Sequence, residues 1–232
     1  MKTKEIIKKN RKAIVLLSIT IPTVNNQQSI SIRGTGFIIS KEGKFITNYH
    51  VYKEIPEGER NFLSVKVIDK DDNKGITYYR EYKVKLIDKD EENDIALMQI
   101  VETDGNIFET IEGFGNSEDV EEGEEMLFVG YPLATELLSM GFGITMSSNS
   151  CIVSSVKKRG VDGSLHLFII DTHVNNGSSG SPIFLKDSGK VVGVVSGKIS
   201  QKIPLPDGKV IDIPANIGIC IPSKYIENII KK

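Results

Sequence analysis

Short apolar segments rich in β-branched residues alternate with turn residues along almost the whole chain, and this pattern constrains the fold most. Turn signals such as Lys41-Glu42-Gly43 and Asp187-Ser188-Gly189 separate the segments, and apolar residues at helical spacing are scarce. The pattern predicts an all-β protein, with strands over residues 13–21, 29–40, 44–48, 62–69, 76–87, 95–101, 125–130, 144–156, 165–171, 182–185, 191–196 and 217–221.

The predicted strands fall into two groups of six on either side of an acidic connector, residues 102–124. A chain of 232 residues with 39% hydrophobic residues can supply a core to each group. We therefore expect two six-stranded antiparallel β-barrels, formed by residues 1–110 and 111–232. At the end of the chain, the spacing of apolar residues in SKYIENIIKK predicts a short helix within residues 222–232.

The N-terminus has two interpretations. The basic start MKTKEIIKKNRK followed by AIVLLSITI resembles a signal peptide, but no small-x-small cleavage site follows it. We favour a short helix over residues 4–12 that leads into the first strand. No segment approaches the ~20 apolar residues of a membrane span. A cytoplasmic location is expected on this basis, and a secreted or periplasmic one stays open.

Charge and cysteine content exclude some classes of protein. With 29 basic and 31 acidic residues, the net charge of −2 gives no reason to expect a nucleic-acid partner. Cys151 and Cys220 are the only cysteines, and both lie in apolar runs, so we expect two buried thiols and no disulfide framework. We expect no metal, cofactor or membrane partner.

One motif points to chemistry. In the stretch NGSSGSP, the glycines of Gly177-Ser178-Ser179-Gly180 permit a tight loop whose backbone N–H groups point to one side. The N–H groups of Gly177 and Ser179 would then form an oxyanion hole beside the Ser179 hydroxyl. A serine nucleophile needs a base, which is usually a histidine, and a carboxylate that orients the base.

Few residues can fill these two roles. Of the three histidines, His166 lies inside an apolar run and His173 is only six residues from Ser179, whereas His50 ends the segment GKFITNYHV. Asp94 is the first residue of the apolar strand DIALMQI, where its carboxylate can be desolvated and oriented. The order His50, Asp94, Ser179 is that of chymotrypsin-type triads, and it places the serine in the other barrel.

On these motifs the chain resembles chymotrypsin-fold serine proteases, and most closely the protease domain of the HtrA (Deg) family. Matching stretches occur in order along the chain: RGTGFIISKEGKFITNYHV, REYKVKLIDKDEENDIALMQI, GFGNSEDVEEGEEMLFVGYPL, IIDTHVNNGSSGSPIF and NIGICIPS. The resemblance implies peptide-bond hydrolysis through an acyl-enzyme. His50 would be the base, Asp94 the orienting acid and Ser179 the nucleophile. The sequence stops soon after the last match, so we expect no PDZ domain.

The resemblance also implies a specificity pocket, formed by His173, Val174, Asn175, Val195, Ser196 and Gly197. Its valines favour small or medium aliphatic residues before the cut, whereas His173 could favour an acidic one. In the usual loop, Asn and Gly stand where this chain has Ser178 and Ser181. The Ser-Gly-Ser-Pro ending also occurs in glutamyl endopeptidases, but Val195 stands where those enzymes have a histidine, so we do not predict glutamate specificity.

Other functions stay open at this stage. The main alternative is a catalytically silent or latent peptide-binding module on the same fold, and a third is an esterase or acyl transferase with the same triad. Protein or peptide substrates are the expected partners. A regulatory protein partner or a homo-oligomer is not excluded.

Overall fold

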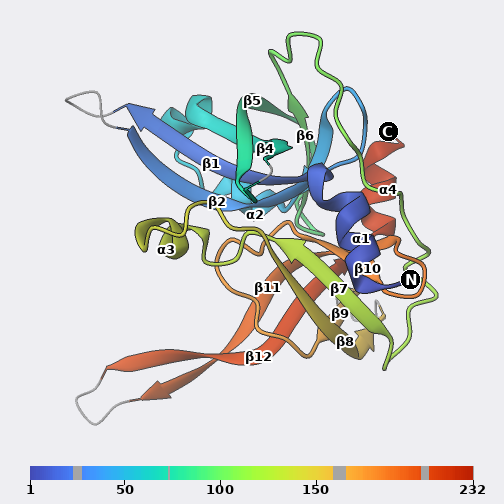
Figure 1. Ribbon diagram of the computed structural model, residues 1–232. Coiled ribbons are helices and arrows are strands. Elements are labelled where there is room, and N and C mark those ends of the chain that lie inside the picture. Colours follow the sequence, from blue (N-terminus) through green and yellow to red (C-terminus); the bar gives the residue numbers. More distant parts are fainter. Residues whose placement is uncertain (23–27, 73, 159–165, 205–208, 232) are drawn as a thin grey trace.

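The computed structural model contains two closed antiparallel barrels of six strands each (Figure 1). It describes residues 1–22, 28–72, 74–158, 166–204 and 209–231. The predicted fold class is therefore confirmed. Position 165, the first residue of the ninth predicted strand, lies outside the described residues, as does Lys232 at the end of the predicted C-terminal helix.

The first barrel has the strand order β1-β2-β3-β6-β5-β4. Phe37, Phe45 and Met98 are fully buried in its interior, where each such side chain contributes about 1.5–3 kcal/mol of hydrophobic free energy. The strands are β1 (Ile14–Pro22), β2 (Gln28–Ile38), β3 (Lys44–Thr47), β4 (Leu63–Asp71), β5 (Thr77–Asp90) and β6 (Ile95–Ile100).

The second barrel has the strand order β10-β11-β12-β9-β8-β7. Phe128, Phe168 and Val195 lie in its own buried cluster, separate from the cluster that fills the first barrel. The strands are β7 (Glu125–Gly130), β8 (Ser147–Lys157), β9 (Leu167–Ile170), β10 (Pro182–Leu185), β11 (Val191–Pro204) and β12 (Val210–Pro222).

Four α-helices and two 3₁₀ turns lie outside the barrels in the described residues. Two of the helices were predicted, namely the N-terminal and C-terminal ones. The other two were not predicted: one of them carries His50, and the other lies after β7. The elements are α1 (Thr3–Asn10), η1 (Arg11–Ala13), α2 (Tyr49–Lys53), η2 (Glu57–Phe62), α3 (Ala134–Ser139) and α4 (Lys224–Ile230).

Each end of the chain contacts the barrel that is formed by the other half of the sequence. Helix α4 follows the second barrel in sequence but packs on β5 and β6 of the first, with Tyr225, Ile226 and Ile229 buried. At the other end of the chain, the amino group of Met1, which precedes α1, donates to the carbonyl oxygens of Lys186 and Asp187 in the second barrel. None of the described helices is long and apolar enough to cross a membrane.

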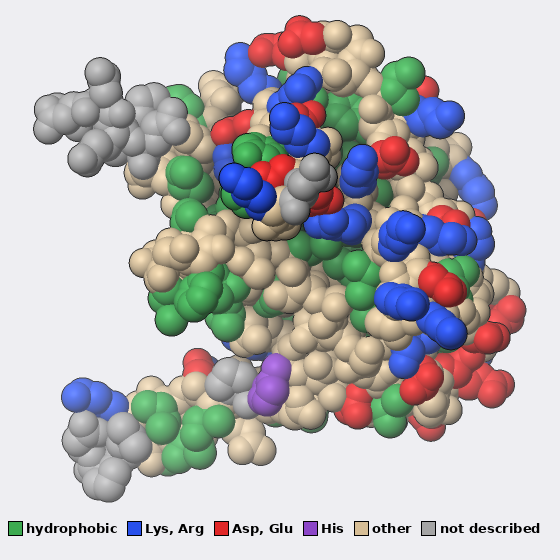
Figure 2. All heavy atoms as spheres, viewed as in Figure 1, with side chains coloured by type: hydrophobic (Ala, Val, Ile, Leu, Met, Phe, Trp, Pro, Cys, Tyr) green, Lys and Arg blue, Asp and Glu red, His purple; other side chains and the backbone are tan. Residues whose placement is uncertain are grey.

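Strands β11 and β12 extend well beyond the predicted strands at residues 191–196 and 217–221. Their outer parts form a two-stranded ribbon that projects from the second barrel (Figures 1 and 2), and we call residues 198–204 and 210–217 the arm. The prediction missed the arm because it relied on buried apolar runs, and residues such as Lys202 and Asp212 interrupt that pattern.

Candidate active site

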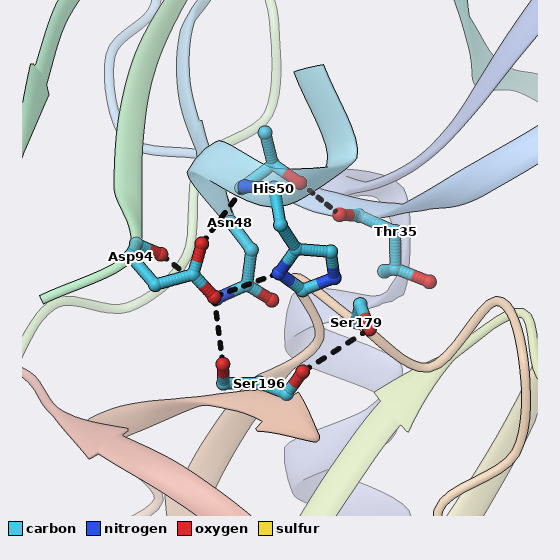
Figure 3. Close-up of polar contacts among 7 residues, drawn as sticks. Thr35, Asn48, His50, Asp94, Ser179 and Ser196 are labelled. Carbon is cyan, nitrogen blue, oxygen red and sulfur yellow. Dashed lines mark hydrogen bonds and ion pairs between the residues drawn. The ribbon is translucent and has the colours of Figure 1, made fainter. Parts of the chain in front are cut away.

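His50, Asp94 and Ser179 meet between the barrels (Figure 3). His50 lies in α2, directly after β3, and Asp94 immediately precedes β6, which pairs with β3. Strand pairing thus brings together two residues that are 44 positions apart. Ser179 comes from the loop between β9 and β10 of the second barrel. The chain therefore brings together the three residues that the sequence singled out.

His50 and Asp94 are joined by two hydrogen bonds. The backbone N–H of His50 donates to Oδ1 of Asp94 at 2.8 Å, and imidazole Nδ1 lies 2.7 Å from Oδ2. Asp94 has a left-handed backbone, with φ of 53°, which costs free energy in any residue except glycine. The backbone carbonyl oxygen of Asp94 accepts hydrogen bonds from the backbone N–H of Tyr49 and from the side-chain amide of Asn48. The start of α2 is therefore bonded to both the backbone and the side chain of Asp94.

Ser196 of β11 connects the two halves of the site. Its hydroxyl donates to Oδ2 of Asp94 at 2.7 Å, and its carbonyl oxygen accepts from the Ser179 hydroxyl at 3.3 Å. The second imidazole nitrogen of His50 faces Ser179 (Figure 3), but no hydrogen bond joins these two side chains in the described part of the chain. Sequence reasoning placed Ser196 in the specificity pocket and missed its bond to Asp94.

The pair has shifted pKa values. Burial lowers the pKa of His50, but the hydrogen bond and the negative charge of Asp94 outweigh burial, and the net pKa is raised above its ordinary value. For Asp94, burial raises the pKa, but the hydrogen bond and charge of His50, with the Ser196 hydroxyl, lower it overall. The carboxylate therefore stays ionised and stabilises the protonated imidazole.

The loop that carries Ser179 requires its glycines. Gly177 has φ of 90° and Gly180 has φ of 87°, in the region that side chains rarely adopt. A Cβ on Gly177 would collide with the carbonyl oxygen of Tyr131, and one on Gly180 would collide with that of Thr35. The loop can therefore lie directly against the backbone of its neighbours.

Three carbonyl groups of this loop are held from outside it. The Thr35 hydroxyl donates to the Gly177 carbonyl at 2.7 Å, and the Leu133 N–H donates to the Asn176 carbonyl at 2.8 Å. The backbone N–H of Thr35 donates to the Ser179 carbonyl at 2.8 Å. The N–H groups of Gly177 and Ser179 donate to no described residue, so both are available to a ligand oxygen. Nothing in the sequence distinguished Thr35 from other strand residues.

The residues predicted to line the pocket have different environments. Val174 and Val195 are buried in the second barrel's core, and a Cβ on Gly218 would lie 2.6 Å from Cγ2 of Val174. The other members line the surface beside the loop, with His173 exposed and Asn175, Ser196 and Gly197 half-buried.

Two further predicted features have a place in the structure. His166 is 2% exposed and packs edge-on against Phe168 and Tyr225, away from the triad, so its role is structural. Ser178 and Ser181, the departures from the usual loop, are also buried, and their hydroxyls have no hydrogen-bond partner among the described residues. The described residues contain no cluster of His, Cys, Asp or Glu that could hold a metal ion.

A sequence profile described as "Trypsin-like peptidase domain" matches residues 34–194, which include His50, Asp94 and Ser179. The chain belongs to this family. This chain is also similar, over most of its length, to trypsin-like peptidases of the HtrA type. It is 33% identical over 172 residues to the "Probable periplasmic serine endoprotease DegP-like" of Pseudomonas fulva (strain 12-X). It is 31% identical over 208 residues to the "Serine protease Do-like HtrA" of Bacillus subtilis (strain 168).

These alignments cover most of this chain but a minor part of each relative. They span 73% and 88% of the chain, and 30% and 40% of the two relatives. A solved structure titled "Crystal structure of Deg5" superposes with a TM-score of 0.66 at 20% identity, covering 98% of this chain and 94% of that one. At this identity the superposition supports the fold alone, and it agrees with the two barrels described above.

Proposed function

We propose that this trypsin-like peptidase domain is a serine endopeptidase with His50, Asp94 and Ser179 as its triad. The observation that carries the proposal is the doubly hydrogen-bonded His50–Asp94 pair, whose free imidazole nitrogen faces Ser179. The available N–H groups of Gly177 and Ser179 lie on the same loop as the nucleophile. The names of the relatives, serine endoprotease and serine protease, agree with this chemistry.

The reaction would proceed in two stages. The Ser179 hydroxyl leaves the Ser196 carbonyl, transfers its proton to His50 Nε2 and attacks the substrate carbonyl carbon. The N–H groups of Gly177 and Ser179 bind the resulting oxyanion. His50 then gives the proton to the leaving amine, which breaks the peptide bond and leaves an ester on Ser179. Water, activated by His50, hydrolyses the ester in the second stage. The incoming water gives a proton to His50, and His50 passes it to Ser179 as the ester bond breaks and the acid product leaves, so the protons balance without a cofactor.

The residue before the cut would be a small or medium aliphatic one. Val174 is apolar, buried and lies against Gly218, and we propose that these two residues close the base of the pocket and limit its depth. His173, the residue that could favour an acidic side chain, is exposed and points to no fixed partner in the described residues. Profiling with a peptide library would test this preference, and a dominant cleavage after glutamate or aspartate would contradict it.

A fluorophosphonate probe tests the proposed nucleophile directly. The probe forms a covalent bond to an activated serine with loss of fluoride, and intact mass spectrometry measures the adduct. We expect one adduct on the wild-type chain and none on Ser179→Ala, with His50→Ala slowed by roughly four to six orders of magnitude. An unlabelled wild-type chain would instead indicate the silent or latent peptide-binding module.

The cellular location is a separate proposal. Cys151 and Cys220 are free and buried, and on this ground we propose the cytoplasm. The Pseudomonas relative is named periplasmic, which points the other way for that protein. Cell fractionation with an antibody decides between them, and recovery outside the cytoplasm would overturn the proposal.

A further inference from the structure

Tyr131 belongs to the second barrel by sequence, but its side chain packs with the core of the first. It directly follows β7, and its side chain is fully buried in the same cluster as the core of the first barrel. The ring packs edge-on against Tyr79 of β5, with ring centroids 6.3 Å apart. Aromatic pairs of this kind stabilise a structure beyond the area that they bury. The Tyr131 ring therefore anchors the segment after β7 to the first barrel.

The backbone of this segment holds the loop that carries Ser179. The Tyr131 N–H donates at 3.0 Å to the Thr35 hydroxyl, which in turn donates to the Gly177 carbonyl. The Tyr131 carbonyl oxygen is so close to Gly177 that a Cβ there would come within 2.3 Å of it. Two residues further on, the Leu133 N–H donates to the carbonyl of residue 176 at 2.8 Å. That carbonyl belongs to the same peptide group as the Gly177 N–H, so the segment sets the direction of this N–H.

The segment is under strain between its two buried ends. Tyr131 and Ala134 are both buried in the core cluster. Leu133, between them, has a left-handed backbone, with φ of 52°. Such a conformation costs free energy in any residue except glycine and persists only where the surroundings hold it. Without the Tyr131 ring, the segment can relax, and the Leu133 N–H would then leave the Asn176 carbonyl.

The Tyr131 hydroxyl adds nothing to the anchor. It is buried and has no hydrogen-bond partner among the described residues. Burial raises the pKa of this phenol well above its ordinary value, so the group is neutral. A buried hydroxyl without a partner destabilises the folded state. The ring and the backbone of Tyr131 therefore hold the segment, and phenylalanine should hold it equally well.

We propose that Tyr131 is a positioning residue for the oxyanion site, because its anchored ring holds the backbone that orients the Gly177 N–H. This inference rests on the proposed endopeptidase function and adds a residue to it. Tyr131 touches neither the substrate nor the reacting atoms, and it acts through Thr35 and Leu133. The oxyanion forms only in the transition state, so losing the anchor lowers kcat and leaves KM nearly unchanged.

The variant Tyr131→Leu tests the anchor, because it keeps an apolar side chain and removes the ring. On a short peptide, kcat should fall about 10²-fold, as expected for a displaced catalytic group, with KM within about threefold of wild type. Phe108→Leu is the matched control. Phe108 lies in the connector between the barrels, is 6% exposed and also packs edge-on against a tyrosine of β5, Tyr82, at 5.3 Å. Both variants should lower the melting temperature, but only Tyr131→Leu should lower kcat.

The conservative variant Tyr131→Phe separates the ring from the hydroxyl. It should keep the wild-type kcat, because the ring and the backbone contacts remain. Its melting temperature should rise by about 2–12 °C, because the variant removes a buried hydroxyl that has no partner. A purely structural view of Tyr131 also predicts the higher melting temperature, so the comparison of kcat between the two Tyr131 variants decides the question.

Two further measurements locate the defect of Tyr131→Leu within the site. The midpoint of its kcat/KM pH profile should stay at the wild-type value, because the hydrogen bonds between His50 and Asp94 do not involve Tyr131. The rate of fluorophosphonate labelling should fall about as much as kcat, because the phosphoryl oxygen of the probe takes the place of the oxyanion. Intact mass spectrometry over time measures this rate.

Several outcomes would overturn the role of Tyr131. One is a kcat for Tyr131→Leu within about threefold of that for Phe108→Leu. Another is a Tyr131→Phe variant that loses as much activity as Tyr131→Leu. If circular dichroism shows that Tyr131→Leu does not fold, Tyr131→Met fills more of the space and takes the same test. A wild-type chain that the probe does not label contradicts the proposed function itself, whereas equal labelling rates for wild type and Tyr131→Leu contradict only the positioning role.

Discussion

Replacing Thr35 with valine should lower the stability of the fold and disturb the loop for which we propose oxyanion binding. The Thr35 hydroxyl is fully buried, donates to the Gly177 carbonyl at 2.7 Å and accepts from the Tyr131 N–H at 3.0 Å. Valine has nearly the same shape, so Thr35→Val creates no cavity. It leaves one buried acceptor and one buried donor without their partner, at about 1–3 kcal/mol each.

The free energy of unfolding should therefore fall by about 2–6 kcal/mol. For a chain of this size, that corresponds to a decrease in melting temperature of about 4–24 °C. The loss of catalysis follows from the same bond. Thr35 and Leu133 fix the peptide groups on either side of Gly177, and these set the direction of its N–H. If that N–H turns away from the oxyanion, kcat should fall by about 10²–10³ with little change in KM.

Calorimetry measures the first effect, and steady-state kinetics on a short peptide below the melting temperature measures the second. Thr35→Ser is the control, because it keeps the hydroxyl and loses one methyl group, worth about 1 kcal/mol. The reasoning is refuted if Thr35→Val melts within about 2 °C of Thr35→Ser and keeps its kcat. A lower melting temperature with an unchanged kcat would restrict Thr35 to stability and contradict its role in orienting the loop.

Three other variants probe the site. Because the pKa of His50 is raised and the base acts when neutral, kcat/KM should fall as the pH drops through a midpoint above the ordinary value of about 6.5. Asp94→Asn removes the carboxylate that raises the pKa of His50 most, so its pH profile should show a lower midpoint and a rate lower by about 10⁴, and an unmoved midpoint would contradict the assignment. Gly177→Ala places a Cβ against the Tyr131 carbonyl and should lower kcat by about 10²–10³, whereas a kcat within about threefold of wild type would show that this loop does not bind the oxyanion. Val174→Ala removes two methyl groups from a buried side chain beside Gly218; if the proposed specificity pocket lies there, library cleavage should shift toward larger apolar residues by about 10–200-fold, and an unchanged profile would place the pocket elsewhere.

The barrels could be predicted because their strands obey local rules. A strand in the wall of a barrel must alternate apolar and polar residues, or be apolar throughout, and turn residues must follow its ends. Strands β7 and β10 therefore begin and end where the sequence indicates. The arm breaks this rule because its residues are not buried, and its length depends on pairing between two strands rather than on a core. The short helix α2 was missed for another reason: five residues are too few to show a helical period.

The site was predictable only as far as residue type reveals chemistry. His50 and Ser179 stand out because few side chains can act as base and nucleophile, and Asp94 because a carboxylate opens a buried strand. Ser196 and Thr35 carry hydroxyl groups like many other strand residues, and what they do depends on partners from the other barrel. Asp94 with Ser196, and Thr35 with Gly177, are contacts over 102 and 142 positions, so no local pattern could indicate them.

One half of the site is formed within a single barrel, and the other half needs contacts from both barrels. The His50–Asp94 pair is built entirely within the first barrel, from β3, α2 and the start of β6. The Ser179 loop belongs to the second barrel, but its Gly177 and Ser179 carbonyls are held by Thr35 from β2 of the first. Docking of the barrels therefore does more than bring Ser179 to His50, because the same contact holds the loop for which we propose oxyanion binding. On this proposal, a small shift between the barrels would leave the His50–Asp94 pair intact and remove the proposed oxyanion site, which is why the hydroxyl of Thr35 is the most informative group to delete first.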